Sequence, residues 1–232
     1  MKSLLLLLLL AVAVSGAETG IEFHTACETG NIMTFRQLVN DGVDINVAGM
    51  DKMTALHKAC RNGHLDIVKM LLALGVNINV GDEDGWTPLH WACWIGHLET
   101  ARLLIENGAD VNVASNSGLT PLHCACQNGH LETARLLIEN GANVNIVDED
   151  GWTPLHCACY NGHLDIARLL IENGANVNDM DNDGWTPLHW VCTYGHLDIA
   201  RLLIDIGADM DAKNNDGNTP LVLAEQYGYL LA

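Results

Sequence analysis

The chain has 232 residues, with 29 acidic side chains against 11 basic ones and a formal net charge of −18. Hydrophobic residues make up 49% of it and charged residues 17%, a composition typical of a folded protein rather than of a disordered chain. The acidity argues against binding to nucleic acid or to anionic membrane surfaces, because the phosphates of both repel carboxylates. A partner with a basic face is favoured instead.

The first seventeen residues have the pattern of a secretory signal peptide. Lys2 supplies one positive charge ahead of an unbroken apolar run at 4–14. Three small residues at 15–17 then offer the positions that a signal peptidase reads. The apolar run is shorter than the roughly 20 residues that cross a bilayer. We therefore predict cleavage of 1–17, no membrane span afterwards, and a secreted or secretory-pathway protein; an uncleaved anchor is the alternative.

From residue 18 onward the sequence repeats with a period of 33. The five prolines keep this step: Pro88, Pro121, Pro154, Pro187 and Pro220. Six of the eight cysteines and two files of histidines follow the same period. Such self-similarity indicates a stacked repeat array. The predicted repeats are a partial first one at 18–48, full ones at 49–81, 82–114, 115–147, 148–180 and 181–213, and a truncated last one at 214–232.

One repeat is enough to predict the local structure. Thr87 is expected to cap the start of a helix, with Pro88 at its first position, where the missing N–H costs nothing. This helix should stop near Gly96, and a second should run over 97–107. Residues 110–113 are expected to be extended and to lead into a turn. Helices this short are not stable alone, so the repeats must stack.

The sequence Thr-Pro-Leu-His-x-Ala occurs intact at Thr87–Ala92, Thr120–Ala125 and Thr153–Ala158, and Gly-His-Leu recurs at a fixed distance behind it. These motifs resemble the ankyrin repeat, and the resemblance covers essentially all of 18–232. It implies an all-α repeat fold, a solenoid of helix-turn-helix units with projecting β-turn fingers. It also implies a domain that binds other proteins and has no catalytic centre of its own.

The first and last repeats depart from this pattern. Lys52 replaces the finger glycine and Ala55 the proline, so we expect a less regular finger in the first full repeat. The last repeat stops where its second helix should begin, whereas arrays need a polar outer cap. Either this end frays, or its apolar residues pair with another molecule, or the chain is a piece of a longer array.

Eight cysteines in a secreted chain would ordinarily suggest disulfides. Six of them, however, are equivalents in successive repeats, whose packed helices lie about 8–10 Å apart. A disulfide needs Cα atoms within roughly 7 Å of each other. Cys124 and Cys126 share a helix but point to different faces, as do Cys157 and Cys159. We therefore expect reduced thiols that pack as small core residues, in tension with an oxidising compartment.

The histidine and acidic clusters do not indicate a metal or a catalytic site. Histidines stepped by a whole repeat cannot converge within the about 2.3 Å that zinc requires. The acidic stretch 179–184 begins like an EF-hand loop, but Trp190 stands where that loop needs a glutamate. Histidine in Thr-Pro-Leu-His is expected to hydrogen-bond around the helix start. With no Ser-His-Asp set, phosphate loop or HExxH motif, we predict no enzyme, no cofactor and no metal.

Function should instead lie where equivalent positions of the repeats differ. One such series is at the finger tip, and another is near the end of the first helix; in the family these positions line the concave, target-binding face. Exposed aromatics there are usual interface anchors, and acidic neighbours select Lys- or Arg-bearing partners. The predicted partner-binding residues are Trp86, Trp152, Trp185, Trp94, Tyr160, Tyr194, Glu83, Asp84, Glu149, Asp150 and Asp183.

Two alternatives remain open at this point. The finger tryptophans could simply pack on the neighbouring finger, and packing is the favoured interpretation for Trp91 and Trp190. The preferred function is a protein-binding module for a basic protein or peptide segment. The rival is a structural spacer, or a module that self-associates through its uncapped C-terminal end.

Overall fold

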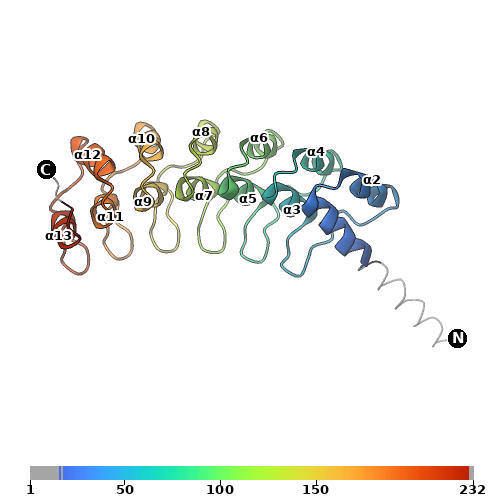
Figure 1. Ribbon diagram of the computed structural model, residues 1–232, viewed down its shortest axis with the longest axis horizontal. Helices are drawn as coiled ribbons and strands as arrows, with labels where there is room; N and C mark the ends of the chain where they lie inside the picture. Colours follow the sequence, from blue (N-terminus) through green and yellow to red (C-terminus); the bar gives the residue numbers. More distant parts are fainter. Residues whose placement is uncertain (1–15, 17, 230–232) are drawn as a thin grey trace, which may run out of the picture. The chain divides into compact units, whose positions relative to one another are not determined.

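The computed structural model describes residue 16 and residues 18–229 (Figure 1). The predicted signal peptide, apart from Gly16, and the last three residues lie outside this part of the chain. The described chain divides into two compact units. Unit 1 contains the described residues up to Ala92 together with Glu99–Ala109. Unit 2 contains Cys93–Leu98 and the described residues from Asp110 onward.

Both units are built from pairs of short helices. In unit 1, residues 18–29 are helical and are followed by α2 (Ile32–Asn40), α3 (Ala55–Arg61) and α4 (Leu65–Ala73). The unit boundary falls within α5 (Pro88–Ile95) and at the start of α6 (Leu98–Glu106). Unit 2 continues with α7 (Pro121–Gln127), α8 (Leu131–Glu139), α9 (Pro154–Tyr160), α10 (Leu164–Glu172), α11 (Pro187–Tyr194), α12 (Leu197–Asp205) and α13 (Pro220–Gln226).

Within unit 2 the helices stack in two rows. The first helices α7, α9, α11 and α13 pack one on the next, and α8, α10 and α12 form the row beside them. The loop that joins each second helix to the next first helix projects away from the second helices (Figure 1); we call these the finger loops. The described residues contain an isolated antiparallel bridge between Ala48 and Thr54 but no β-strand, which confirms an all-α repeat fold.

A threonine and a histidine fix the start of the first helices α3, α5, α7, α9 and α11. In α9, the hydroxyl of the N-cap Thr153 accepts the backbone N–H of His156, and the Thr153 N–H donates to His156 Nδ1 at 3.2 Å. Because Nδ1 accepts, Nε2 carries the proton, and it lies 3.1 Å from the Trp185 carbonyl oxygen of the next finger loop. The expected role of this histidine is confirmed, and its far nitrogen also ties two repeats together.

The second file of histidines joins neighbouring repeats in the same way. His196 Nε2 lies 3.1 Å from the Tyr160 carbonyl oxygen, and His163 Nε2 lies 3.2 Å from that of Gln127. An asparagine side chain also joins neighbouring finger loops: Asn145 Nδ2 donates to the Gly174 carbonyl oxygen at 3.0 Å. These bonds recur at the same positions of successive repeats, so they fix each repeat against its neighbour.

All eight cysteines lie in the core, as expected of small apolar side chains. The core of unit 2 also contains buried leucines such as Leu155 and Leu170. Burial raises the pKa of the Cys192 thiol to about 12, and that of Cys27 in unit 1 to about 12 as well. Thiols with such pKa values stay protonated and are poor nucleophiles at neutral pH.

Two local expectations were wrong. Residues 111 and 112 form a turn rather than an extended segment, because the Asn112 N–H donates to Asp110 Oδ1 at 2.9 Å. Lys52 does not disrupt its finger turn: it adopts a φ of 55°, in the left-handed region that Gly85, Gly151 and their equivalents occupy. The turn geometry therefore survives, at the cost of placing a side chain where glycine is favoured.

No helix among the described residues is long and apolar enough to cross a membrane.

Candidate functional site

A buried aspartate organises each finger loop that precedes a tryptophan-bearing helix. Asp181 is 7% exposed, and its Oδ1 accepts the backbone N–H groups of Asp183 at 3.0 Å and Trp185 at 2.8 Å. In unit 1, Asp82 Oδ1 accepts the N–H of Trp86 at 2.9 Å in the same arrangement. These carboxylates fix where the finger tryptophans stand relative to the loop backbone.

The second oxygen of the same aspartate holds a tryptophan of the first helix. Trp190 Nε1 in α11 donates to Asp181 Oδ2 at 3.2 Å, and Trp91 Nε1 in α5 donates to Asp82 Oδ2 at 2.9 Å. Burial raises the pKa of Asp181, although its hydrogen bonds oppose that shift. One carboxylate thus locks a finger loop and an indole ring into a single rigid element in each unit.

In unit 2 these elements build the aromatic cluster, which consists of Trp152, Tyr160, Trp185, Trp190 and Tyr194. Trp190 is its centre: its ring centroid lies 4.4 Å from that of Trp185, 4.9 Å from Trp152 and 5.3 Å from Tyr160. The rings of Tyr160 and Tyr194 are 4.7 Å apart and meet edge to face. Tyr194 is 43% exposed, and the other four side chains are half-buried. Five rings are therefore in contact and still reach solvent.

Hydrogen bonds and burial also perturb the polar groups of this cluster. A hydrogen bond with Tyr160 raises the pKa of the Tyr194 hydroxyl. Asp148 Oδ1 accepts the N–H groups of Asp150 at 3.0 Å and Trp152 at 2.8 Å, and partial burial raises the pKa of Asp148. The Asp148 side chain thus lies at the base of the loop that carries Trp152 of the cluster.

The corresponding place in unit 1 is occupied by a cation of the chain itself. The Trp86 and Trp91 rings are 4.9 Å apart, and the guanidinium carbon of Arg61 lies 4.7 Å from the Trp91 ring centroid. Lys58, three residues earlier in α3, has its Nζ 3.8 Å from the Asp51 carboxylate and 3.8 Å from that of Glu28. In this unit Arg61 thus stacks on the Trp91 indole, and Lys58 pairs with two carboxylates.

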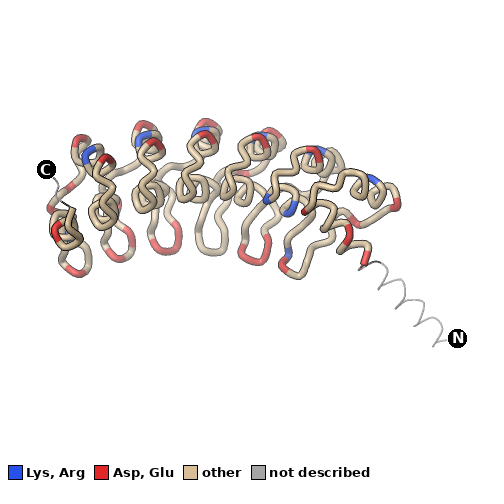
Figure 2. Tube along the Cα trace, in the orientation of Figure 1, with Lys and Arg blue, Asp and Glu red and all other residues tan. Residues whose placement is uncertain are grey.

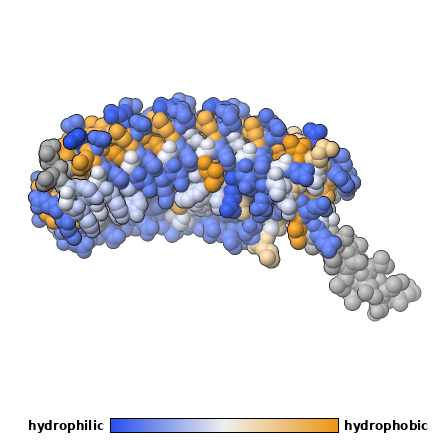
Figure 3. Space-filling model, in the orientation of Figure 1, coloured by the Kyte–Doolittle hydropathy of each residue, from blue (hydrophilic) through white to orange (hydrophobic). Residues whose placement is uncertain are grey.

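The charge is distributed unequally between the units. Unit 2 has 4 basic residues against 17 acidic ones, and the described part of unit 1 has 6 against 12. In unit 2, acidic residues lie both at the finger loops and on the second helices, whereas three of the four basic residues lie on the second helices (Figure 2). Hydrophilic residues cover its finger side in the view of Figure 3. The exposed finger carboxylates include Glu149, Asp150 and Asp183 in unit 2 and Glu83 and Asp84 in unit 1.

The structure brings most of the predicted aromatic residues together. Trp152, Trp185, Tyr160 and Tyr194 belong to the aromatic cluster. Trp86 lies with Trp91 in unit 1. The finger carboxylates are exposed at the loops that carry these tryptophans.

Trp94 lies at the position of the repeat that Tyr160 occupies later in the chain. It is half-buried near the end of α5, and its carbonyl oxygen lies 3.0 Å from His130 Nε2.

Sequence reasoning missed the centres of the two groups. Trp190 and Trp91 do pack, as favoured, but both are half-exposed and carry the ring contacts and the aspartate bond. One signal could have found Trp190: it precedes Tyr194 by four residues, so both lie on one helix face. The stacking of Arg61 on Trp91 had no local signal, because the two residues lie in different repeats.

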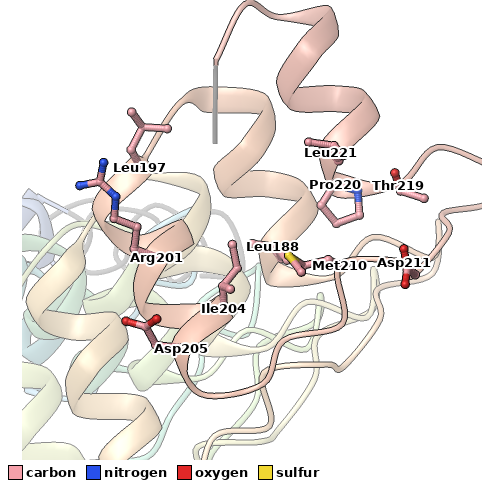
Figure 4. Close-up of a pocket in the computed structure, with 10 residues that line it drawn as sticks. All are labelled: Leu188, Leu197, Arg201, Ile204, Asp205, Met210, Asp211, Thr219, Pro220 and Leu221. Atoms are coloured by element: carbon pink, nitrogen blue, oxygen red, sulfur yellow. The ribbon is translucent and has the colours of Figure 1, made fainter. Parts of the chain in front are cut away.

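A second candidate surface is an apolar groove at the α11–α13 end of unit 2, with a volume of about 540 Å³ (Figure 4). Leu188 of α11, Ile204 of α12 and Met210 of the following loop point into it, and Pro220 and Leu221 of α13 form its other side (Figure 4). Arg201 and Asp205 of α12 supply its polar rim. Among the described residues, no group of three or more His, Cys, Asp or Glu could hold a metal ion.

Comparison with protein families agrees with this architecture. A family model of ankyrin repeats (3 copies) matches residues 23–115 and 110–181, and a model of ankyrin repeats (many copies) matches 162–204 and 188–224. The comparison with curated proteins returned no match. Ankyrin repeats are generally protein–protein interaction modules and typically have no enzymatic activity of their own. Together the matches span most of the sequence, and the chain belongs to the ankyrin repeat family.

Proposed function

We propose that the chain is a non-enzymatic module that binds a basic protein or peptide segment through an acidic, aromatic face. The face meant is the aromatic cluster of unit 2 together with the finger carboxylates Glu149, Asp150 and Asp183. The observation that carries the proposal is the contact of five half-buried or exposed rings beside these carboxylates. Rigid, partly exposed aromatics supply contact area at low entropic cost, and the carboxylates select and steer a cationic partner.

The aromatic rings are held in place before any partner arrives. Trp190 is fixed by its bond to Asp181, and Trp185 and Trp152 are fixed through the backbone bonds of their finger loops. A surface that is ordered in advance loses less conformational freedom on binding than a flexible one. The family generally binds proteins, so an ordered aromatic surface of this kind is best explained as a docking site.

A peptide selection tests this proposal. Random peptides displayed on phage and panned on the full chain are expected to be enriched in Lys and Arg. The enrichment should disappear for the variant Glu149→Gln/Asp150→Asn, whose side chains have no hydrogen bond or ion pair in the structure. The matched control is Glu139→Gln/Glu172→Gln, which removes the same charge from α8 and α10. Selection of neutral or acidic peptides, or equal loss in the control, would refute the proposal.

Affinity capture of natural partner proteins tests whether the aromatic rings take part in binding. The variant Trp86→Ser/Trp152→Ser/Trp185→Ser should recover none of the basic proteins that the wild type recovers. If both recover the same proteins at the same yield, the finger-loop face is not the binding surface. Circular dichroism of the variant shows whether its helices are intact.

We further propose that the protein acts outside the cell or in the secretory pathway. The support is the signal-like sequence of 1–17. Mass spectrometry of protein secreted from an expressing cell should find a chain that begins at Glu18. Retention of 1–17 in a cytoplasmic product would contradict this localisation.

Self-association is the second candidate, and the apolar groove favours it. Leu221, Val222 and Tyr227 of the α13 region are 49%, 45% and 52% exposed, which is high for such side chains. A second copy would cover them. Light scattering after size exclusion should then find a discrete dimer that Leu221→Glu converts to monomer. A wild-type monomer at high concentration would rule this out.

A further inference from the structure

The 33-residue period places two different residues at one position of the fold. Arg61 precedes Trp91 by 30 residues, and Tyr160 precedes Trp190 by the same number. Trp91 and Trp190 are themselves equivalent, since each lies in a first helix and donates to the aspartate that begins its own finger turn. Tyr160 in unit 2 therefore stands where Arg61 stands in unit 1.

Arg61 shows what this position can bind. Its guanidinium carbon lies 4.7 Å from the Trp91 ring centroid, within the about 6 Å over which a cation is attracted to an aromatic face. The Asp82 side chain, which accepts the Trp91 Nε1–H at 2.9 Å, lies at the edge of the same ring. Unit 1 thus contains an internal example of arginine recognition by an Asp-tethered tryptophan.

Unit 2 repeats the tethered tryptophan but supplies no cation to it. The residues at the Arg61 position in this unit are Trp94, Gln127, Tyr160, Thr193 and Gln226, none of which is charged. Three of its four basic residues, Arg135, Arg168 and Arg201, are exposed on the second helices, and the fourth, Lys213, is in a loop before α13. The rings that meet Trp190 instead are those of Tyr160 and Tyr194, and Tyr194 is 43% exposed.

We propose that three solvent-reaching rings of the aromatic cluster in unit 2, those of Tyr160, Trp190 and Tyr194, bind an arginine side chain of the partner's basic segment. This inference rests on the proposed function and names the side chain that its binding face takes. The partner's guanidinium supplies the cation that Arg61 supplies within unit 1. Finger carboxylates such as Asp183 then pair with further basic residues of the segment.

Arginine is favoured over lysine by the behaviour of the chain's own cations. Arg61 stacks on an indole, whereas Lys58, three residues away on the same helix, is directed to the carboxylates of Asp51 and Glu28. A planar, weakly hydrated guanidinium stacks on rings, while an ammonium is strongly hydrated and acts as a point charge. Five contiguous rings form a stacking surface rather than a carboxylate cage.

Three matched peptides test the inference on the full wild-type chain. Each is a short Gly/Ser peptide with three identical substituted positions, occupied by arginine, by lysine or by citrulline, which is a neutral isostere of arginine. Isothermal titration should find that the arginine peptide binds about tenfold more tightly than the citrulline peptide, and several-fold more tightly than the lysine peptide. Equal binding of the arginine and citrulline peptides, or of the arginine and lysine peptides, would overturn it.

The second test is a variant in which an arginine of the chain itself occupies the proposed arginine site. Tyr160→Arg should place a guanidinium over Trp190, as Arg61 lies over Trp91, and lower the affinity for the arginine peptide about tenfold. Gln127→Arg is the matched control, because it adds the same charge at the equivalent position, where the residue 30 positions later is Cys157 instead of tryptophan. If both variants weaken binding of the arginine peptide equally, the effect is due to net charge alone, and recognition by the rings is refuted.

These outcomes separate the inference from the proposed function. If arginine and lysine peptides bind equally, and the Glu149→Gln/Asp150→Asn variant weakens both, the acidic face stands and arginine recognition is wrong. If neither basic peptide binds at any accessible concentration, both the inference and the proposed function fail.

Discussion

Units 1 and 2 contain the same tethered tryptophan but differ in what lies on it. Asp82 and Trp91 in unit 1 repeat the arrangement of Asp181 and Trp190 in unit 2. In unit 1 Arg61 covers the ring, and in unit 2 Tyr160 and Tyr194 extend the aromatic surface. A repeat scaffold thus keeps a rigid element constant and changes its surface by single substitutions at one position, which turns a closed site into an open one.

Acid should produce the largest difference between the units. Burial lowers the pKa of His123 and of His156, both in unit 2, to about 4. The unfolded histidines take up protons below about pH 6.5 and the folded ones only near pH 4, so the free energy of unfolding falls across that window. The loss is on the order of 3 kcal/mol for each histidine. The raised pKa values of Asp148 and Asp181 act in the opposite sense and offset part of it.

Urea unfolding followed by hydrogen exchange measures this effect in each unit. Amides of α9 and α10 should lose more protection between pH 7 and pH 4.5 than those of α3 and α4. In unit 1 the pKa of His57 is also lowered by burial, so that unit is expected to weaken as well, but less. Unchanged stability of unit 2 at pH 4.5 would contradict the account.

The shared aspartate should matter equally in both units. Asp181→Asn and Asp82→Asn each remove the negative charge of a carboxylate that accepts two backbone N–H groups and an indole N–H. Each substitution should therefore lower the free energy of unfolding by about 2 kcal/mol. Asp183→Asn is the control, because its side chain is exposed. A loss confined to one unit would show that the two tethers are not equivalent.

The finger turn offers a smaller contrast. Lys52→Gly in unit 1 should raise the free energy of unfolding by about 1 kcal/mol, since glycine adopts the φ of 55° without strain. The reverse change, Gly184→Lys in unit 2, should cost more than that, because a Cβ there would lie 2.9 Å from Asn215 Oδ1. Thermal unfolding of the two single variants checks both signs, and a destabilised Lys52→Gly protein would count against the interpretation of the turn.

The covering arginine should have the smallest effect on stability. Arg61→Gln removes an exposed cation from the Trp91 ring and should lower the unfolding free energy by about 0.5–1 kcal/mol. Arg36→Gln, which removes an exposed cation on α2, should change it less. Equal losses in both variants would mean that the stacking contact contributes nothing of its own.

The sequence predicts most of the scaffold because the same motifs recur at equivalent positions of successive repeats. Pro154 and its equivalents mark the helix starts, and the histidine two residues later was correctly placed at the cap. The turn at Asn112 was missed because a side-chain bond to a backbone N–H, not a pattern of hydrophobicity, decides it. Lys52 was expected to disturb its finger, yet the surrounding backbone bonds hold it in the glycine conformation.

The candidate site was only partly predictable. Finger aromatics and carboxylates stood out as variable positions, and four of the aromatics do meet. Trp190 was assigned to packing because cysteines occupy its position in other repeats, and its exposed edge depends on the neighbouring repeat. The contact between Arg61 and Trp91 joins residues 30 apart in the chain, and only the three-dimensional structure gives their distance.

Fluorine NMR of the chain labelled with 5-fluorotryptophan tests the central claim most directly, because the six tryptophans each give a signal. On adding the arginine peptide, the signals of Trp152, Trp185 and Trp190 should shift, while those of Trp86 and Trp91 should stay unchanged. Equal shifts in both groups, or shifts confined to Trp86 and Trp91, would contradict an open site in unit 2 and a closed one in unit 1.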